Sequence, residues 1–232
     1  MPALTVPEPQ GLTLRDVRVD VPGRSLLDVP HLSLTHGQSV AVCGASGAGK
    51  STLLHALAGL LRPQAGAVIW GQTDLCRLTE DGRTRFRRQH IGMIFQDFLL
   101  FDELDALHNA DIASAFAARA DRPARQRAAR DWLTRLGLAQ TGARRVDHFS
   151  GGERQRIAVA RALVGAPSIL LADEPTASLD RATADRLITD LLAVAQDHRR
   201  TLIAVTHDAS LIARMDRVLR LHDGRIVEDS HG

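Results

Sequence analysis

The sequence predicts an α/β fold in which a mainly parallel sheet is interrupted by an inserted helical subdomain. A short apolar strand at 39–43 leads through a glycine-rich loop into a helix. Further short apolar segments recur along the chain, as expected for buried parallel strands. Between Phe95 and Ser168 the pattern changes to alanine- and arginine-rich segments with helical spacing, which indicates inserted helices.

Each expected element follows from a local pattern. The helix at 51–61 has leucines at helical spacing, and Gly59, Pro63 and Gly66 mark its end. A second helix runs over 154–163. The remaining elements are strands at 67–70, 91–95, 169–172 and 202–206, helices at 109–120 and 124–136, and a hairpin of strands 218–221 and 225–228 around His222-Asp223-Gly224.

Composition and charge indicate a single domain of 232 residues. The net charge of +2 implies no strong field for a polyanion, so we expect no nucleic-acid partner. The first ten residues are rich in proline and lack an apolar core, so we expect no signal peptide, and no apolar run is long enough to span a bilayer. Cys43 and Cys76 form no motif; we expect both to be reduced and Cys43 to be buried.

A basic run stands out in the helical segment. It serves either as a surface for a partner or nucleic acid, or as the solvated face of a helix. We favour the solvated face, because charged runs are usually exposed to water. The run consists of Arg119, Arg122, Arg125, Arg127 and Arg130.

The glycine-rich loop carries the first chemical motif. Of the 29 lysine and arginine residues, only Lys50 is lysine, and its loop fits the G-x-x-x-x-G-K-[ST] pattern that wraps nucleotide phosphates. A compact ammonium enters a glycine-lined nest, whereas a planar guanidinium is too wide. A plain glycine turn before a helix is the alternative, and the strand–loop–helix order argues against it. The expected ATP-binding residues here are Gly44, Ala45, Ser46, Gly47, Ala48, Gly49, Lys50, Ser51 and Thr52, with Ser51 also a Mg²⁺ ligand.

Two carboxylates follow the apolar strand at 169–172. Ligands of open α/β sheets bind at the carboxyl ends of the strands, which is where Asp173 and Glu174 stand. We expect Asp173 to hold a magnesium ion through water and Glu174 to polarise the water that attacks the γ-phosphate. Acidic residues often follow strands, so the pair becomes informative only after the phosphate-binding loop.

The segment Ser150-Gly151-Gly152-Glu153 has two compatible interpretations. Ser-x-x-Glu is a capping box at the start of a helix. Two glycines at a helix N-terminus also leave backbone N–H groups open to an anion. The cap therefore does not argue against a binding site.

Taken together, these motifs resemble the ATP-binding subunit of an ABC transporter. The resemblance rests on the loop at 44–51, on Ser150-Gly151-Gly152-Glu153-Arg154-Gln155-Arg156 and on Asp173-Glu174-Pro175-Thr176-Ala177-Ser178-Leu179-Asp180, and it covers nearly the whole chain. It implies a P-loop NTPase core, at 1–95 and 168–232, with an N-terminal antiparallel β subdomain and a helical subdomain at 96–167.

The resemblance also implies roles for single residues. Gln96 matches the glutamine that senses Mg²⁺ and the γ-phosphate, and His207 matches the switch histidine that contacts that phosphate. Asp180 matches the aspartate that crosses between monomers. With Lys50 and Glu174, His207 completes the expected catalytic set. Ser150, Gly151, Gly152 and Glu153 are expected to contact ATP on a second copy of the chain.

Within the family, the chain resembles the branch that serves lipoprotein release, macrolide and peptide export and the cell-division system. The resemblance rests on the segments 88–98 and 152–156. The branch tends to have proline where Phe101 stands and glutamate where His108 stands, so the segment expected to touch the permease departs from the pattern. The family also stacks adenine on an aromatic residue upstream of the loop, and here Val21 is the nearest equivalent.

The resulting prediction is an ATPase motor. Two copies bind ATP and Mg²⁺ head-to-tail and drive a separate membrane permease, at the cytoplasmic face of the inner (plasma) membrane. The alternative is a soluble non-transport ABC ATPase, but those commonly carry tandem cassettes, coiled coils or nucleic-acid arms, for which this chain has no room. A third possibility, a nucleotide-binding scaffold without turnover, is disfavoured by Glu174 and His207.

Overall fold

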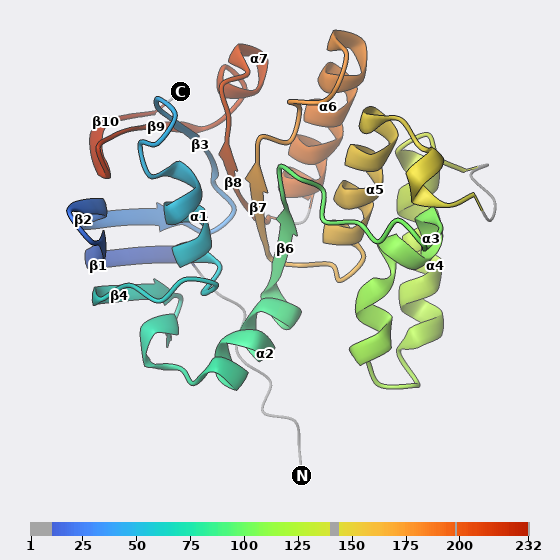
Figure 1. Ribbon diagram of the computed structural model, residues 1–232, viewed down its shortest axis with the longest axis horizontal. Helices are drawn as coiled ribbons and strands as arrows, with labels where there is room; N and C mark the ends of the chain where they lie inside the picture. Colours follow the sequence, from blue (N-terminus) through green and yellow to red (C-terminus); the bar gives the residue numbers. More distant parts are fainter. Residues whose placement is uncertain (1–10, 140–143, 198, 232) are drawn as a thin grey trace.

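The computed structural model describes residues 11–139, 144–197 and 199–231, which form two sheets surrounded by helices (Figure 1). In the larger sheet all neighbouring strands are parallel except the two strands nearest the C-terminus, which form an antiparallel hairpin. The predicted mainly parallel sheet and the C-terminal hairpin are therefore confirmed. In spatial order the strands are β10 (Arg225–His231), β9 (Arg217–His222), β3 (Ser39–Cys43), β8 (Thr201–Val205), β7 (Ile169–Asp173) and β6 (Ile91–Ile94).

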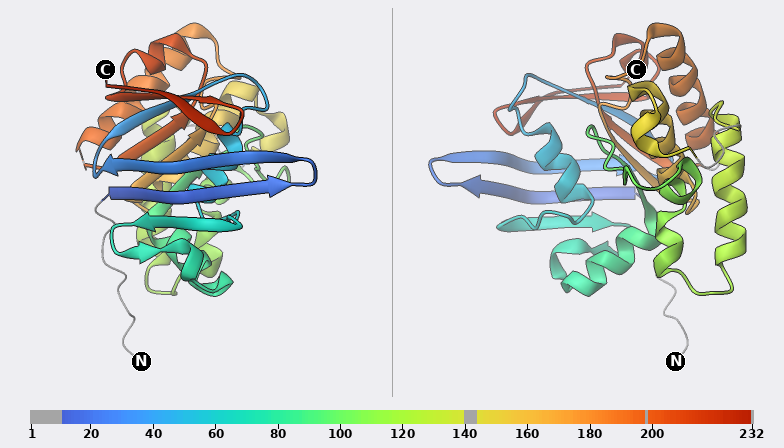
Figure 2. Two further views of the ribbon diagram at one scale, coloured as in Figure 1. Left: turned by 90° about the vertical axis from the view of Figure 1, so that its left-hand side faces the viewer. Right: turned by 45° about the vertical axis from the view of Figure 1, so that its right-hand side comes forward.

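The smaller sheet is entirely antiparallel, as the family resemblance implied. Its two longest strands alternate apolar and polar residues, with Leu12, Leu14, Val17 and Val19 buried. Figure 2 shows their hairpin projecting beyond the rest of the molecule. In spatial order the strands are β2 (Arg24–Thr35), β1 (Gly11–Val21), β4 (Ala65–Trp70) and β5 (Thr73–Asp74).

Helices α3 to α5 lie between β6 and β7 in the chain and gather on one side of the molecule (Figure 1), where the sequence predicted inserted helices. Within the described part of the chain, no helix combines the length and the apolar character needed to cross a bilayer. The helices are α1 (Lys50–Leu57), α2 (Glu80–His90), α3 (Ala106–Ala110), α4 (Arg122–Arg135), α5 (Gly151–Leu163), α6 (Arg181–Asp197) and α7 (Ala209–Ile212), with 3₁₀ turns η1 (Leu75–Arg77), η2 (Ile112–Phe116) and η3 (Val146–His148).

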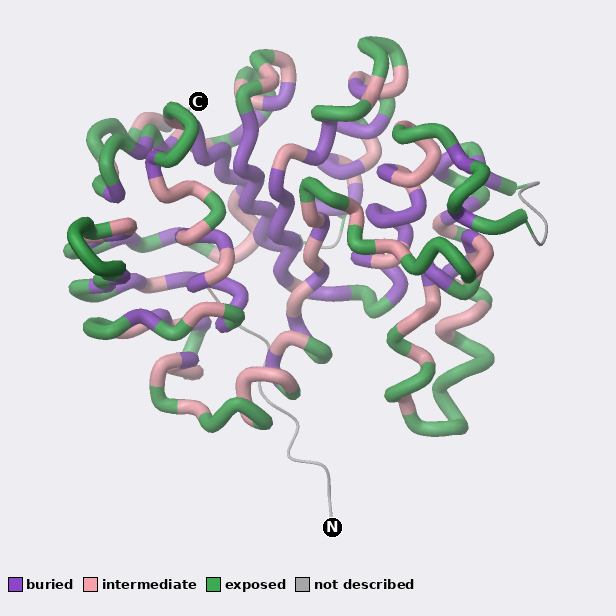
Figure 3. Tube along the Cα trace, in the orientation of Figure 1, coloured by how far each residue is buried: buried purple, intermediate pink, exposed green. Residues whose placement is uncertain are grey.

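The parallel sheet separates two apolar cores, and its strands β3, β7 and β8 are buried on both faces (Figure 3). Successive side chains of a strand point to opposite faces. Ile169 and Leu171 of β7 therefore join the core that contains α1 and the smaller sheet. Leu170 and Ala172 join the core that contains α5 and α6. The helix after the glycine-rich loop and the helix that begins after Ser150 thus cover opposite faces of the sheet.

The predicted helix at 109–120 was wrong. The chain forms α3, which ends earlier, and then the 3₁₀ turn η2. The side chain of Asn109 bonds to the backbone of Phe101 and Leu104, which fixes α3 against the preceding loop. Asp111 then leaves the helical region at φ −103°, ψ 19°. The helix propensity of the alanines that follow is therefore not enough to extend α3 beyond Ala110.

Two long helices, α2 and α6, were not anticipated from the pattern. α2 has a strongly polar composition and buries only Phe86 and His90, so its apolar face is too narrow to give a clear period. α6 has the clearer signal, because Leu187, Ile188 and Leu191 repeat at helical spacing on its buried side. The predicted helix at 51–61 is shorter than expected, because α1 ends at Leu57.

Candidate nucleotide-binding site

The glycine-rich loop connects β3 to α1 at the carboxyl edge of the parallel sheet. Gly44 (φ 150°) and Gly49 (φ 100°) adopt backbone conformations that residues with a side chain rarely adopt. A Cβ atom at Gly44 would lie 2.3 Å from the carbonyl oxygen of Leu221, and one at Gly49 would lie 2.4 Å from that of Leu26. Close packing against β9 and β2 therefore requires both glycines of the motif.

The ammonium of Lys50 is held on this loop. Its Nζ atom donates hydrogen bonds to the carbonyl oxygens of Gly44 and Ala45, each at 2.9 Å. Ala45, Ser46 and Gly47 are exposed, so the outer surface of the loop is open to a ligand. The positive charge and the N-terminus of α1 thus lie together where a phosphate group can reach them.

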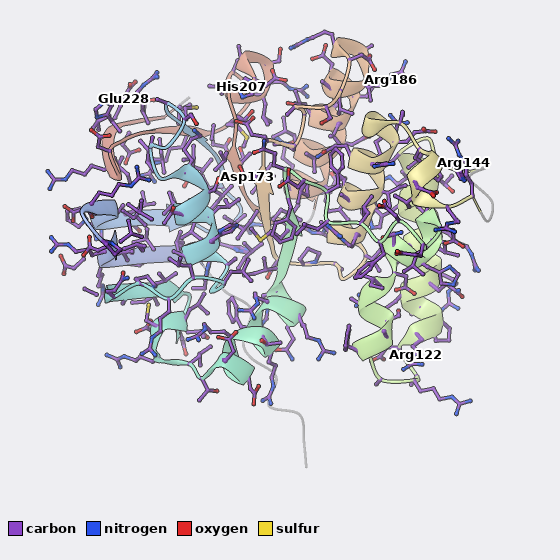
Figure 4. All side chains as sticks on the ribbon, in the orientation of Figure 1. Arg122, Arg144, Asp173, Arg186, His207 and Glu228 are labelled. Atoms are coloured by element: carbon purple, nitrogen blue, oxygen red, sulfur yellow. The ribbon has the colours of Figure 1, made fainter. Side chains whose placement is uncertain are left out.

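Glu174 and His207 are brought together by the parallel pairing of β7 and β8. Glu174 directly follows β7 at φ 47°, and its N–H donates to the carbonyl oxygen of Val205 at 2.9 Å. His207 follows β8, and its Nδ1 atom lies 2.9 Å from Oε1 of Glu174. Asp173, 7% exposed, ends β7. Figure 4 shows Asp173 and His207 in the same upper central part of the molecule.

The second carboxylate oxygen of Glu174 is an exception in this site. Oε2 is buried and has no hydrogen-bond partner among the described residues. A buried acceptor of this kind costs free energy unless a donor satisfies it. A water molecule beside Glu174 would supply that donor, so the residue suits the alignment of a nucleophilic water.

The residues expected to bind Mg²⁺ also gather at this edge. Gln96 comes two residues after β6, which pairs in parallel with β7 so that Ile94 lies opposite Ala172. Gln96 and Ser51 are exposed, and Asp173 is nearly buried. Hydroxyl, amide and carboxylate oxygens are the ligands that Mg²⁺ prefers. The donor set therefore fits a magnesium ion carried by a nucleotide.

The segment at 150–153 forms the predicted capping box. Oγ of Ser150 accepts from the N–H of Glu153 at 3.3 Å, and Oε2 of Glu153 accepts from the N–H of Ser150 at 2.8 Å. The hydrogen bond from that backbone N–H lowers the pKa of Glu153, and Arg144, 3.7 Å away, adds to the effect. The side chain of Glu153 thus stabilises the start of α5 through its hydrogen bond from the backbone N–H of Ser150.

The two glycines of this segment lie against the loop that precedes α6. A Cβ atom at Gly152 would lie 3.2 Å from Cδ2 of Leu179, and one at Gly151 would lie 3.8 Å from Cβ of Ser178. Asp180, the next residue of that loop, caps α6 by accepting from the N–H and hydroxyl of Thr183. The hydroxyl bond is the main cause of the lowered pKa of Asp180.

Three residues near the Glu174–His207 pair were not singled out from the sequence: Thr176, Asp208 and Arg181. Thr176 donates to Asp208 at 3.1 Å, and Arg181 donates to the same carboxylate at 3.4 Å. The only sequence signal was their position beside Glu174, His207 and Asp180. The hydrogen bond from Thr176 to Asp208 joins the loop after β7 to the loop after β8. The two residues are 32 positions apart in the chain.

The remaining predictions concern single side chains. Val21 ends β1 and is 40% exposed, so no bulky group covers it. Cys43 is buried, which raises the pKa of its thiol, and both cysteines are free. Of the basic run, only Arg125 turns partly inward, 3.7 Å from Asp111. The other four arginines are exposed to solvent, Arg119 in the turn before α4 and the rest on α4 itself.

Comparisons with known proteins agree with this geometry. Residues 27–177 match the family model described as ABC transporter. The chain is 43% identical over 209 residues to the lipoprotein-releasing system ATP-binding protein LolD of Syntrophotalea carbinolica, covering 90% of this chain and 89% of that protein. It is 40% identical over 210 residues to the ABC transporter ATP-binding protein YbbA of Escherichia coli, covering 89% and 90%.

Solved structures of the bacterial ABC transporter cassette MJ0796 are similar over the whole fold. The dimeric structure of that cassette gives a TM-score of 0.87 at 30% identity, covering 95% of this chain and 98% of that chain. Its post-hydrolysis dimer, bound to ADP and Pi, gives a TM-score of 0.84 at 29% identity with the same coverage. The family model, the relatives and the fold therefore lead to one conclusion: this chain belongs to the ABC transporter family, as an ATP-binding subunit with ATPase activity.

Proposed function

We propose that the chain is the motor subunit of an ABC transporter and that two copies hydrolyse ATP as a head-to-tail dimer. The observation that carries this proposal is the division of the site between two faces of one sheet. Lys50 stands at the start of α1 on one face, whereas Ser150 caps α5 on the other. Figure 1 shows β6, β7 and β8 between these two helices. A second copy can supply the Ser150 segment to the Lys50 loop without any rearrangement of the sheet.

Within that dimer each residue has a proposed role. Residues 44–52 bind the triphosphate, and Lys50 supplies positive charge to the phosphates. Ser51, Gln96 and Asp173 hold Mg²⁺, which, when bound, neutralises developing charge on the phosphates. Glu174 aligns the attacking water through its free Oε2, and His207 contacts the γ-phosphate. From the second copy, residues 150–153 close over the nucleotide and Asp180 reaches across the interface.

The division of the chain follows the same logic. The core at 1–95 and 168–232 holds the nucleotide, and the helical subdomain at 96–167 carries the Ser150 segment. Within the helical subdomain, Arg161 of α5 holds the segment that follows Gln96. It donates to the carbonyl oxygen of Phe98 at 2.6 Å and also to that of Leu99, and burial lowers its pKa. These bonds tie the segment after Gln96 to α5, so a displacement of Gln96 by a bound nucleotide would be passed to the helix that begins after Ser150.

A membrane permease of the lipoprotein-release or macrolide-export type completes the transporter, and it holds the motor at the cytoplasmic face of the inner membrane. A groove of about 980 Å³ between α2 and the helical subdomain is the proposed docking site, and its lining does not include Phe101 or His108, which the sequence placed in the segment expected to touch the permease. Arg85, Arg88 and Arg125 line it, and Phe116 beside it is 71% exposed. This chemistry suits a short helix that carries acidic and apolar side chains.

Glu174→Gln tests the motor function. The amide keeps the shape of the side chain but is a much weaker acceptor for the attacking water, so we expect ATP binding to remain and turnover to fall by a factor on the order of 10². The closed dimer should accumulate with ATP, because hydrolysis no longer opens it. Phosphate release and size-exclusion chromatography measure the two effects. Release of phosphate at the wild-type rate would exclude the assigned role of Glu174.

A further inference from the structure

A second polar contact lies beside the Glu174–His207 pair and joins the same two loops. The hydroxyl of Thr176 donates to Oδ2 of Asp208 at 3.1 Å. Thr176 is 7% exposed, and the side chain of Asp208 is 13% exposed, so water competes little for this bond. The loop after β7 and the loop after β8 are therefore connected twice: at Glu174–His207 and at Thr176–Asp208.

Asp208 is the most fully bonded residue of this region. Oδ1 accepts from the N–H of Ser210 at 2.9 Å and from Arg181 at 3.4 Å, while Oδ2 accepts from Thr176. Its own N–H donates to the hydroxyl of Thr206 at 3.0 Å. Burial alone would raise the pKa of Asp208, but the hydrogen bonds from Ser210 and Thr176 outweigh it and lower the pKa. The carboxylate is therefore held charged and fixed in position.

Arg181 extends the connection to the loop that ends at Asp180. It donates to Asp185 one turn along α6, at 2.8 Å and 3.2 Å, and also bonds the hydroxyl of Ser210. The guanidinium thus bridges the start of α6 and the start of α7. The Asp208 carboxylate, held by one guanidinium N–H, the N–H of Ser210 and the hydroxyl of Thr176, has few alternative positions.

His207 has little other support. Its side chain is 80% exposed, and its bond to Glu174 is the one hydrogen bond that its ring makes within the described residues. An exposed imidazole is not oriented by packing. The position of His207 therefore depends on the backbone on either side of it. On one side, the N–H of Thr206 donates to the carbonyl oxygen of Val42 at 3.2 Å. On the other side, the carboxylate of Asp208 fixes the backbone.

We propose that Asp208, held by Thr176 and Arg181, is a positioning residue that aims His207 at the γ-phosphate and keeps it in contact with Glu174. This inference rests on the proposed function, because it assumes that His207 acts in hydrolysis. Asp208 touches none of the reacting atoms and acts only through the loop that carries His207. Because Arg181 directly follows Asp180, the same contacts link the loop proposed to meet the second copy to the histidine.

A double-mutant cycle tests the proposal. Thr176→Val keeps the volume of the buried side chain and removes its hydroxyl. Misplacing a catalytic group slightly is costly, so we expect kcat to fall by about tenfold while KM for ATP changes little. Because the loss passes through His207, Thr176→Val should cost at most about twofold when His207 is already alanine. Thr176→Ser should restore kcat, since it restores the hydroxyl donor.

Thr201→Val is the matched control. Thr201 is 1% exposed, lies at the other end of β8, and accepts a hydrogen bond from the N–H of Gly37 at 3.1 Å. Loss of that bond can lower stability, but it should leave kcat unchanged. Thermal unfolding of each variant separates a folding defect from a positioning defect.

The outcomes separate the two levels of the argument. If His207→Ala alone leaves kcat unchanged, both the role of His207 and this inference are wrong. If His207→Ala impairs kcat but Thr176→Val has no effect, or an equal effect in both backgrounds, only the positioning role of Asp208 is wrong. Asp208→Ala provides a second variant, and its loss of kcat should also shrink in the His207→Ala background.

Discussion

Lys50 shows how one side chain is selected by its surroundings. The chain uses arginine at every other position that carries a lysine or arginine. At position 50 the ammonium reaches two carbonyl oxygens of its own loop at 2.9 Å each. A branched planar guanidinium would occupy more of the space between those carbonyls. The choice of residue therefore follows from the shape of the loop as much as from charge.

Val21 leads to a prediction about base selectivity. The described residues 11–35 contain no Phe, Trp or Tyr, and Val21 is exposed at the end of β1. The contacts proposed for residues 44–52 address the triphosphate, which ATP and GTP share, so GTP should displace ATP at comparable concentrations. Val21→Tyr should raise ATP affinity by about tenfold, since stacking on a ring contributes about 1–3 kcal/mol per base.

Competition binding on the isolated subunit measures both effects. Val227→Tyr is the control, because Val227 is also an exposed valine but lies on β10. If GTP fails to displace ATP at large excess and Val21→Tyr changes nothing, another group supplies the platform for the base.

At the scale of elements, the conformation of the glycine-rich loop is fixed by the strands that pack against it. Its first glycine lies against β9, and Gly49 lies against Leu26 of β2. The N–H of Gly224, in the β9–β10 turn, also donates to the carbonyl oxygen of Ala48 at 3.0 Å. The loop is thus wedged between two sheets, which keeps its amides in place before a nucleotide binds.

Gly49→Ala and Gly47→Ala distinguish steric exclusion from backbone strain. Both glycines have positive φ, at 100° and 78°, so alanine costs on the order of 1 kcal/mol at each. Only at Gly49 would the new Cβ meet a backbone oxygen, at 2.4 Å, whereas nothing lies within 4 Å at Gly47. We expect Gly49→Ala to lose a further 1–3 kcal/mol or so in free energy of unfolding. Urea unfolding measures the difference, and equal losses would contradict it.

At the scale of the whole molecule, the parallel sheet divides the proposed site. α1 and the phosphate-binding loop belong to one face, and α5 with its capping box belongs to the other. The loop 178–180 lies against the two glycines of the Ser150 segment and continues into α6. The parts proposed to face a second copy therefore support one another within a single chain.

Mixing two inactive variants tests the composite site. Lys50→Ala removes the phosphate contact, and Ser150→Arg places a bulky charge at the N-terminus of α5. Each variant alone should lose nearly all ATPase activity, because both sites of its dimer are defective. In a mixed dimer, Lys50 of one chain and Ser150 of the other form one intact site. Mixing should therefore restore activity, up to roughly a quarter of wild type if sites act independently and pairing is random.

The rate of phosphate release from equimolar mixtures measures this recovery. Each variant measured alone, at the same total concentration, provides the baseline. If mixing restores nothing while both variants remain folded and dimeric with ATP, the sites either require each other or do not lie between copies. Full activity of Ser150→Arg alone would show that the site is completed within one chain.

The sequence by itself determined the family and the parallel core, and it supplied most of the residues of the proposed site. Lys50, Glu174 and the Ser150 segment lie in contiguous motifs, and the chemistry of such motifs depends on residue types a few positions apart. The apolar strands were also predicted, because burial on both faces leaves a continuous apolar run.

Only the tertiary structure decided which groups meet across the chain. Three features depend on the parallel pairing of β7 and β8, which local patterns do not encode. They are the unpartnered Oε2 of Glu174, the contact of its other oxygen, Oε1, with His207, and the hydrogen bonds of Asp208. The bonds of Asn109 that hold α3 are more local, because they reach residues only eight and five positions earlier in the chain. Short-range propensity is weak, so contacts between distant segments determine the result wherever the two disagree.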